Sequence, residues 1–439
     1  MENSMSASLP VQYTHTSSQS TPAPVILLEV DIAKPIPCVV LIDLSNGQHY
    51  QHGLLLVRMY DDPMGFIELE TDEFQIEPRQ VASIIWEKLS ENINKQLEIF
   101  ALPTIATLTP MGLPRRGKPT HIQQRVQLKI DAPMMSVVVC TRSRPEKLVR
   151  CLRSLEMLDY PVFEIIVIDN APDDDITFKL VNSMFPDVHY VREETLGLSQ
   201  ARNKGLEVAI GDIIAFTDDD AIVDRNWLLE VLRGFNGRDD VMCVSGLTLP
   251  AELETPSQIW YQRQRGQTVQ FTRNLMNMTS SPLCALAHSA LHGAGINMAF
   301  KRTFLEQIGG FDTALGLGSA TLSGEDLAAY FEVAMRSYQI AYEPGAIVYH
   351  DHRETYAELR NQIYRHNVGV GACLTRLLLN NPRHALKLPF YMLRLIKQSL
   401  KKHTAPVRYP VRFRMTEIKG LLHGSVAYYL SRKRSTRTT

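Results

Sequence analysis

Three consecutive carboxylates, Asp218, Asp219 and Asp220, follow the short apolar run Ile213–Phe216 in this chain of 439 residues. The apolar run predicts a buried strand. Side chains alternate along an extended segment, so Asp218 and Asp220 would point to the same side. Two carboxylates about 4 Å apart repel each other by roughly 4 kcal/mol at an effective dielectric constant of about 20. A divalent cation removes that repulsion, and oxygen ligands suit Mg²⁺ or Mn²⁺. The triplet therefore predicts a metal site, and an acidic surface turn or a helix cap is the plainer alternative.

Polar residues also follow two apolar runs earlier in the chain. Thr141 and Arg142 come after Val137–Cys140, and Asp169 comes after Phe163–Ile168, with a helical pattern of apolar residues between the two runs. The order strand, helix, strand predicts a parallel sheet with right-handed crossovers. Ligands bind at the carboxyl ends of the strands in such sheets. We therefore expect these residues and the aspartate triplet to share one site.

Arg202 lies in the segment Leu196–Gly205, just ahead of the aspartate strand. Ser199 could cap a helix that carries Arg202 in an early turn. A guanidinium there could bind a phosphate or a nucleotide through two hydrogen bonds. An ordinary exposed helix arginine is the alternative.

A second acidic group, Glu325 and Asp326, follows the glycine-containing turn Gly309–Asp312 and the loop Gly316–Gly318. Ser323 and Asp326 have the S-x-x-D spacing of a capping box, which gives Asp326 a structural interpretation. The other interpretation is a general base at the start of a helix, held by backbone amides beside a flexible loop that binds substrate.

Two histidines, His350 and His352, lie at the end of a predicted strand over Ile347–His352 and would share one face of it. At this spacing they could ligate a metal or simply be solvated.

The composition is that of a soluble globular protein, with 45% hydrophobic residues, 21% charged residues and a formal net charge of −1. This charge points to no particular partner and gives no indication of nucleic-acid binding. The length predicts two or three domains. We expect a disordered tail over 1–24, a small α+β accessory domain over 25–100, a Pro-rich linker over 101–132, an α/β domain over 133–355 and a helical basic region over 356–439.

The sequence also predicts a compartment. The six cysteines are scattered without a C-x-x-C pair, which argues against a zinc site or a disulfide framework and fits a reducing environment. No secretory signal and no apolar run of roughly 18 residues is visible. We therefore expect a cytoplasmic protein.

The C-terminal region is basic. From Leu377 onward Glu417 is the one acid among many Lys and Arg, and Leu386–Leu400 is apolar with interspersed basic residues. This pattern predicts either a helix on the inner face of the membrane, giving peripheral membrane contact, or an ordinary amphipathic helix packed on the domain.

Taken together, these segments resemble family 2 glycosyltransferases, enzymes of the GT-A fold that use nucleotide-activated sugars. The resemblance covers about Met135 to His352, and its elements occur in the order of the family: S-V-V-V-C-T-R-S-R-P at 136–145, V-I-D-N at 167–170, A-R-N-K-G at 201–205, F-T-D-D-D at 216–220, G-G-F-D at 309–312 and G-E-D-L at 324–327. The resemblance implies a GT-A domain, an α/β fold with a Rossmann-like, mainly parallel sheet flanked by helices. The small N-terminal α+β unit and the C-terminal helices fall outside it.

The resemblance also implies roles for the nucleotide-sugar donor site. Thr141, Arg142 and Asp169 match positions that hold the nucleotide base and ribose. Arg202 matches a donor-site arginine, and Asp219 lies within the donor motif. The family more often has Leu where this chain has Thr217.

The metal and acceptor sides follow in the same way. Asp218 and Asp220 match the ends of the DxD motif, with Asp220 as a direct metal ligand and Asp218 nearer the ribose or the metal shell. Asp326 matches the catalytic base, with Gly324 and Glu325 on the acceptor side. His350 matches a position from which some GT-A enzymes supply a histidine to the metal or diphosphate.

The implied activity is transfer of a sugar, with inversion, from a nucleotide-diphosphate sugar to a hydroxyl of a glycan, lipid-linked or polysaccharide-precursor acceptor, with Mg²⁺ or Mn²⁺ as cofactor. An aspartate-based phosphatase is a rival, but it requires Thr or Val two residues after the second aspartate, where this chain has Ile222. A non-catalytic nucleotide-sugar-binding or scaffold protein with a GT-A fold is the other alternative. Release of nucleoside diphosphate distinguishes an enzyme from a scaffold.

Overall fold

The computed structural model describes residues 23–43, 46–114, 117, 119–266, 269–277, 295–380, 393 and 410–438. The chain forms two compact units. The smaller comprises Met1–Asp131, Leu249–Arg273 and His350–Thr355, and the larger comprises Ala132–Thr248, Asn274–Tyr349 and Tyr356–Thr439. The tail expected over 1–24 lies outside the described residues except for its last two positions. The helix expected over Leu386–Leu400 lies outside them except for Leu393.

The smaller unit contains a three-stranded sheet in the order β1 (Val25–Asp31), β3 (His52–Met59), β4 (Asp62–Glu70). Strands β1 and β3 are parallel, and β3 and β4 are antiparallel. Helix α1 (Pro78–Ile99) packs on this sheet through apolar residues at helical spacing: Val81, Ile85, Leu89 and Ile93. A separate ladder pairs β2 (Val39–Val40) with β5 (Gln75–Ile76).

The segment expected as a linker contains helix α2 (Thr120–Ile130). The His121 ring stacks on Phe100 with ring centroids 3.7 Å apart, and Arg125 donates to Asp62 Oδ1 at 2.8 Å. Both α2 side chains are buried. Helix α2 is therefore fixed to the core of the smaller unit.

The stretch after residue 255, which has no clear sequence pattern, supplies helix α7 (Pro256–Gly266) and strand β12 (Asn274–Asn277). Leu253 and Ile259 pack with Leu54, so the chain returns to the smaller unit at this point.

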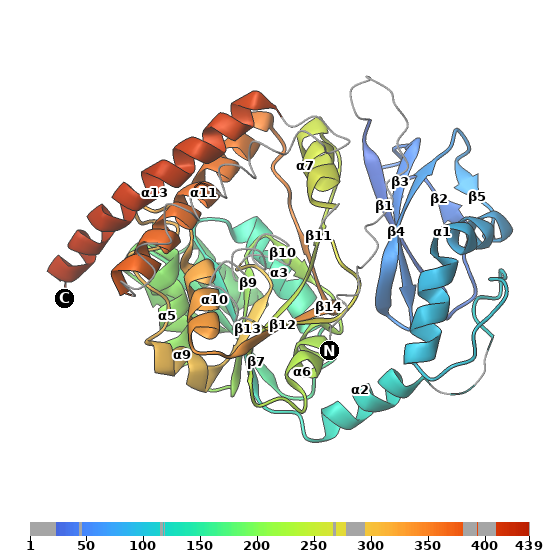
Figure 1. The fold of residues 1–439 in the computed structure, drawn as a ribbon, viewed down its shortest axis with the longest axis horizontal. Helices are drawn as coiled ribbons and strands as arrows, with labels where there is room; N and C mark the ends of the chain where they lie inside the picture. The colour runs from blue at the N-terminus through green and yellow to red at the C-terminus, as the bar shows by residue number, and fades with distance from the viewer. Residues whose placement is uncertain are drawn as a thin grey trace. The chain divides into compact units, whose positions relative to one another are not determined.

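The larger unit is built on a main sheet of nine described strands (Figure 1). The order is β10-β14-β11-β13-β9-β6-β7-β8, and β12 pairs with β14. Strands β8, β7, β6 and β9 are parallel, whereas the pairs β9/β13, β13/β11 and β14/β12 are antiparallel. The bounds are β6 (Met135–Thr141), β7 (Phe163–Asn170), β8 (His189–Glu193), β9 (Ile213–Asp218), β10 (Ala221–Val223), β11 (Val241–Pro250), β13 (Met298–Lys301) and β14 (Gln339–His350).

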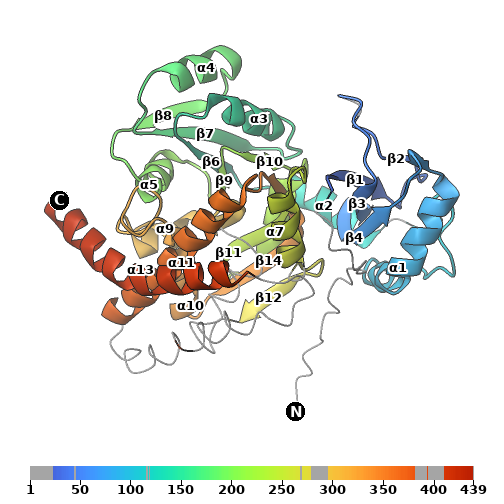
Figure 2. The ribbon, with the colours of Figure 1, turned by 90° about the horizontal axis from the view of Figure 1, so that it is seen from above.

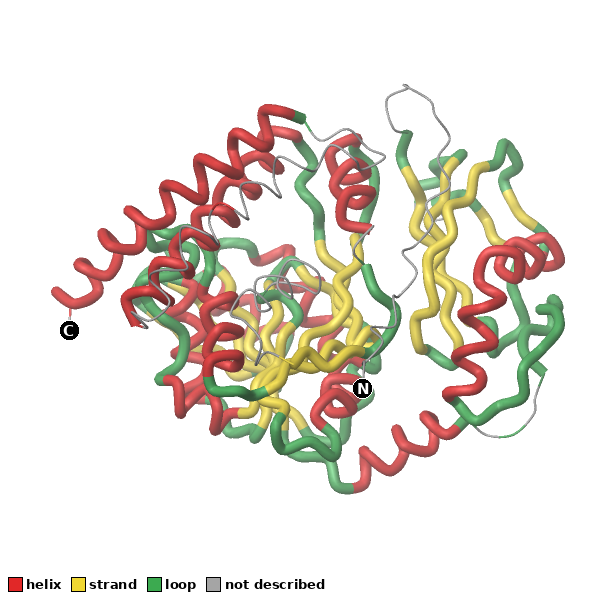
Figure 3. Tube along the Cα trace, viewed as in Figure 1, coloured by secondary structure: helices red, strands yellow, loops and turns green. Residues whose placement is uncertain are grey.

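Helices surround this sheet, and Figure 3 shows them in red around the yellow strands. They are α3 (Pro145–Glu156), α4 (Ile176–Met184), α5 (Leu198–Val208), α6 (Trp227–Phe235), α9 (Arg302–Ile308), α10 (Glu325–Met335), α11 (Tyr356–Asn380) and α13 (Val411–Thr438). The core is apolar and includes Val138, Ile166, Phe216, Phe300 and Tyr330. The α/β class, with a flanked main sheet, a small N-terminal sheet and C-terminal helices, is confirmed.

The register of the parallel strands fixes where the polar strand ends lie. Cys140 of β6 pairs with Asp218 of β9, and Thr141 pairs with Asp169 of β7. The ends of three neighbouring strands therefore meet at one edge of the sheet, as expected from the sequence.

Helices α11 and α13 lie side by side in both views (Figure 1, Figure 2). Glycines allow their backbones to meet. A Cβ added to Gly371 of α11 would lie 2.2 Å from the carbonyl oxygen of Leu421, and one added to Gly424 of α13 would lie 2.2 Å from that of Val368. The backbones of the two helices therefore approach each other closely at these glycines.

Candidate functional site

The aspartate triplet forms a turn in which the middle residue points inward. Asp219 is almost fully buried, and Thr141 Oγ1 donates to its Oδ2 at 2.7 Å. Arg144 Nη1 lies 3.2 Å from Asp219 Oδ1 and 3.1 Å from Asp220 Oδ2. Burial raises the pKa of Asp219 to about 6, although Arg144 and Thr141 act to lower it. The geometry gives Asp219 an anchoring position behind its two neighbours.

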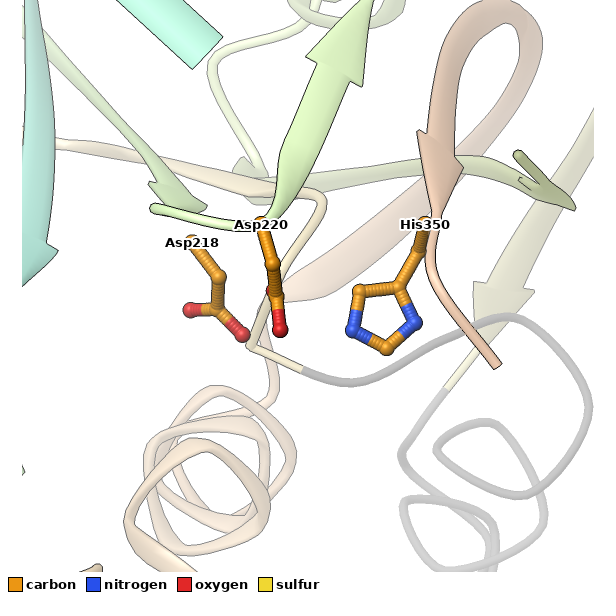
Figure 4. Close-up of side chains that lie close together, drawn as sticks. All are labelled: Asp218, Asp220 and His350. Carbon is orange, nitrogen blue, oxygen red and sulfur yellow. The ribbon is translucent and has the colours of Figure 1, made fainter. Parts of the chain in front are cut away.

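Asp218 and Asp220 lie beside His350, and Figure 4 shows the three side chains projecting in the same direction. One ligand atom from each lies within 4.8 Å of the other two. Two carboxylates and one imidazole suit a divalent cation, and the nitrogen ligand favours Mn²⁺ over Mg²⁺, which prefers oxygen ligands alone. This arrangement fits the metal site that the sequence predicted.

His352 does not join this group of ligand atoms. It is buried, and its Nε2 lies 3.2 Å from Gln262 Oε1. Strand β14 ends at His350, so the two histidines do not share the regular alternation of one strand.

Arg202 links the aspartate turn to the start of α10. Its side chain is 3% exposed; Nη1 donates to Glu325 Oε1 at 2.8 Å, and Nη2 lies 3.7 Å from Asp218 Oδ1. Nη2 also donates to the carbonyl oxygen of Gly295 at 3.2 Å. The alternative of an exposed helix arginine is therefore wrong, because Arg202 is buried among acidic partners.

The cap predicted for α5 is also wrong. The helix begins after Gly197, which is its N-cap residue, and Ser199 lies inside the first turn. The Ser199 hydroxyl donates instead to the carbonyl oxygen of Leu315 at 2.8 Å. The Ser199 hydroxyl therefore bonds to a residue far away in sequence instead of capping its own helix.

The capping box predicted at α10 is absent as well. The N-cap residue is Gly324, with φ at +106°, a conformation that favours glycine, and no side chain caps the helix. Asp326 Oδ2 accepts from the backbone N–H of Gly295 at 2.7 Å, and Oδ1 accepts from that of Leu327 at 2.7 Å. Backbone amides from two segments thus hold the Asp326 carboxylate, which is the arrangement expected of the base hypothesis.

Glu325 lies next to this carboxylate and is buried. Burial raises its pKa to about 7. The charge of Arg202 acts to lower this pKa, and the charge of Asp326 acts to raise it. Its Oε2 atom is buried and has no hydrogen-bond partner among the described residues. Glu325 therefore binds a proton more readily than an ordinary carboxylate does.

On the expected nucleotide side, Asp169 is buried and accepts from the Tyr190 hydroxyl at 2.8 Å. Burial raises its pKa, which the Tyr190 hydrogen bond partly offsets. The Arg142 side chain is 45% exposed, with Nη2 3.7 Å from Asp173 Oδ1. The structure thus brings Thr141 and Asp169 to the strand ends beside the aspartates and leaves Arg142 exposed next to them.

Arg144 had no predicted role, although it lies in the segment 136–145. Its contacts with Asp219 and Asp220 depend on the tight turn after β6. A second basic residue so close to a strand end was the available signal.

A second group without a predicted role joins the C-terminal helices to the site. Arg376 of α11 donates to Asp312 Oδ2 and to Glu332 Oε1, both at 2.7 Å, and the Tyr428 hydroxyl of α13 donates to Asp312 Oδ2 at 2.9 Å. We call Asp312, Glu332, Arg376 and Tyr428 the C-terminal network. Cys373 Sγ also donates to the carbonyl oxygen of Gly324 at 2.9 Å. Helices α11 and α13 therefore hold both ends of the segment between Asp312 and Gly324.

Residues 136–309 match the family described as Glycosyl transferase family 2. The chain is 26% identical over 198 residues to a glucosyl-dolichyl phosphate glucuronosyltransferase of Haloferax volcanii, covering 42% of this chain and 57% of that protein. It is 26% identical over 234 residues to a pre-mycofactocin glycosyltransferase of Mycobacterium tuberculosis, covering 53% of this chain and 45% of that one.

The chain thus spans about half the length of these curated relatives. A solved mannosyltransferase of Pyrobaculum calidifontis, in complex with GDP-Man and Mn²⁺, is similar over 71% of this chain and 94% of its own, at 18% identity and a TM-score of 0.47. The motifs, their order and the family match agree. The chain therefore carries a family 2 glycosyltransferase domain over residues 136–309.

Proposed function

We propose that this chain transfers a sugar from a nucleotide-diphosphate sugar to an acceptor hydroxyl, with inversion at the anomeric carbon. The observation that carries the proposal is the position of Arg202. Its guanidinium contacts Asp218, one of the candidate metal ligands, and Glu325, next to the candidate base. One buried cation thus joins the two groups of residues that such a transfer needs.

Asp218, Asp220 and His350 would hold the cation, Mn²⁺ or Mg²⁺. A divalent cation bound there would neutralise negative charge on the diphosphate leaving group. Arg144 contacts the inward side of the turn and balances part of its charge. The turn therefore retains its shape through contacts supplied by the protein itself.

Asp326 is assigned as the general base, which takes the proton from the acceptor hydroxyl as that oxygen attacks the anomeric carbon. Its two backbone hydrogen bonds, from Gly295 and Leu327, fix the orientation of the carboxylate. Fixed orientation is what general base catalysis requires of a side chain. Gly324 and Glu325 would then lie on the acceptor side, and Glu325 keeps Arg202 in place.

Thr141, Arg142 and Asp169 are assigned to the nucleotide, with Asp218 and Asp219 completing the donor side. Asp169 is buried and presents a carboxylate that already accepts one hydroxyl hydrogen bond, from Tyr190. Arg142 is exposed at the same edge of the sheet, where a guanidinium can meet a charged donor.

For the acceptor, we propose a lipid-linked sugar or a polysaccharide precursor. The similarity to the glucosyl-dolichyl phosphate glucuronosyltransferase of Haloferax volcanii supports the lipid-linked class. We place the protein in the cytoplasm, at the inner face of the membrane. Among the described residues, no helix combines the length and the hydropathy needed to cross a bilayer.

The test is a panel of nucleotide sugars with Mn²⁺, with Mg²⁺ and with EDTA. Thermal shift would report donor binding, and release of nucleoside diphosphate would report turnover. We expect a metal-dependent shift with one donor and nucleoside diphosphate release with the matching acceptor. A donor-dependent shift without any release, across the acceptor panel, would support a nucleotide-sugar-binding scaffold instead.

A further inference from the structure

Helix α13 has two different faces. One face packs on α11 and is buried, with Phe413, Leu421 and Tyr428 among its residues. The other face is apolar and exposed. Its large side chains are each between 51% and 62% exposed: Val411, Met415, Leu422, Val426, Tyr429 and Leu430. Most of these residues are three, four or seven positions apart, so they form one stripe along the helix. We call this stripe the apolar face of α13.

Basic residues flank the apolar face. Arg412, Lys419, Arg432 and Lys433 are exposed, and the one acid of the helix, Glu417, is buried. The Lys433 ammonium lies 4.6 Å from the centre of the Tyr429 ring. An exposed apolar stripe with a rim of one positive sign is the pattern of a helix that lies in a membrane interface.

We propose that the apolar face of α13 binds the surface of a membrane that contains anionic lipids. The charges favour lipid over a second copy of this chain. Two copies paired through this face would bring basic rims together without an exposed acid on either helix to compensate them. Anionic headgroups attract the same rim, and the apolar side chains enter the boundary between headgroups and acyl chains.

This surface also has a physical link to the site. Tyr428 lies on the buried side of the same helix, and its hydroxyl donates to Asp312, which Arg376 also binds. A membrane that orients α13 would therefore orient the segment leading to Asp326. This consequence rests on the proposed function, but the membrane contact itself does not.

The experiment uses the full chain and requires no turnover. Vesicles of phosphatidylcholine mixed with phosphatidylglycerol, and vesicles of phosphatidylcholine alone, are floated through a density gradient with the protein. We expect binding to the anionic vesicles that weakens as salt is raised, and little binding to the neutral ones. Absence of binding by the folded wild type to either vesicle would overturn the proposal.

Variants locate the surface. The double variant Leu422→Ser with Val426→Ser should weaken binding to anionic vesicles about tenfold or more. Lys419→Glu with Arg432→Glu should weaken it and remove most of its salt dependence. A matched control on another helix, Ile176→Ser with Met184→Ser on α4, changes two residues that are 54% and 46% exposed and should leave binding unchanged.

Thermal melts of each variant show whether it is folded. If folded Leu422→Ser/Val426→Ser binds vesicles as the wild type does, α13 is not the membrane surface. Light scattering gives a further check. A wild-type dimer that becomes monomeric in this variant would show that the face joins two copies and would also overturn the lipid assignment.

Discussion

The aspartate turn after β9 and the acidic start of α10 each present carboxylates, but they hold them differently. In the turn, a guanidinium and a hydroxyl hold the acids: Arg144 lies against Asp219 and Asp220, and Thr141 donates to Asp219. At α10, backbone amides hold Asp326. Arg202 touches both regions.

The difference separates two tasks. A group of three acids retains mutual repulsion, which a bound cation can relieve. A carboxylate held by amides has a fixed direction without a neighbouring cation attached to the same oxygens. It is therefore suited to accept a proton from a substrate. The aspartate turn would bind a metal cation, and Asp326 at the start of α10 would accept a proton.

The strongest test of this division is Asp220→Ala. Removal of one of the two metal carboxylates should abolish metal-dependent donor binding and lower transfer by about a thousandfold, which corresponds to the several kcal/mol that charge neutralisation supplies. Thermal shift with donor and Mn²⁺, together with nucleoside diphosphate release, measures both. Asp187→Ala, at an exposed aspartate between α4 and β8, is the control. Unchanged metal-dependent donor binding in Asp220→Ala would remove the metal from this turn.

Asp326→Asn tests the other region. Asn retains nearly the same shape and can still accept one of the two backbone hydrogen bonds, but it cannot take a proton. We expect kcat to fall about a hundredfold, within the range that a general base contributes, while the donor Kd stays unchanged. Isothermal titration with donor and steady-state kinetics separate the two quantities. Near-normal kcat would return Asp326 to a purely structural role.

The two regions were not equally predictable from the sequence. The buried run ahead of Asp218 and the alternation of side chains were enough to predict the paired carboxylates, because both depend on neighbours along the chain. Local patterns failed at Ser199 and at Ser323, where caps were expected. The Ser199 hydroxyl instead binds the carbonyl of Leu315, and α10 begins at a left-handed glycine.

The arginine contacts were not predicted for the same reason, namely that they depend on residues distant in sequence. Arg144, Arg202 and Arg376 each bind acids far away in sequence, and no spacing rule predicts such pairs. The exposed stripe of α13 also depends on which face α11 covers. The sequence therefore predicted the strand edge and suggested which residues to propose as metal ligands and base, whereas the contacts of the buried arginines required the structure.

Glu325, at the start of α10, makes the stability of the folded protein depend on pH. Its folded-state pKa, raised by burial to about 7, exceeds the ordinary value of 4.5. The folded protein therefore keeps a proton that the unfolded chain releases, and the stability contributed by Glu325 falls as pH rises through this window. The Glu325→Gln variant has no carboxyl group at this position and therefore lacks this pH dependence. We expect wild type to lose about 1 to 3 kcal/mol relative to the variant between about pH 5 and pH 8.

Denaturant melts of both proteins across this range measure the difference. Glu306→Gln, at a half-exposed residue of α9, is the control and should follow the wild type in parallel. If the free energy of unfolding changed with pH in the same way for wild type and Glu325→Gln, Glu325 would have an ordinary carboxylate pKa in the folded protein. Burial beside Asp326 would then do little to disfavour its charged form.

The smallest expected effect is at Arg376, and it tests whether α10 needs support from outside. Arg376 reaches Asp312 through Nε and Glu332 through Nη1, and a lysine has a single ammonium that cannot reproduce this geometry. We expect Arg376→Lys to lower stability by about 1 kcal/mol and kcat by about threefold, with the donor Kd and the metal dependence unchanged. Arg365→Lys, at an exposed position of the same helix, is the matched control. A change confined to stability would limit the C-terminal network to folding. If metal-dependent donor binding fell as well, the C-terminal network would support the aspartate turn in addition to the start of α10. The two regions would then not act independently.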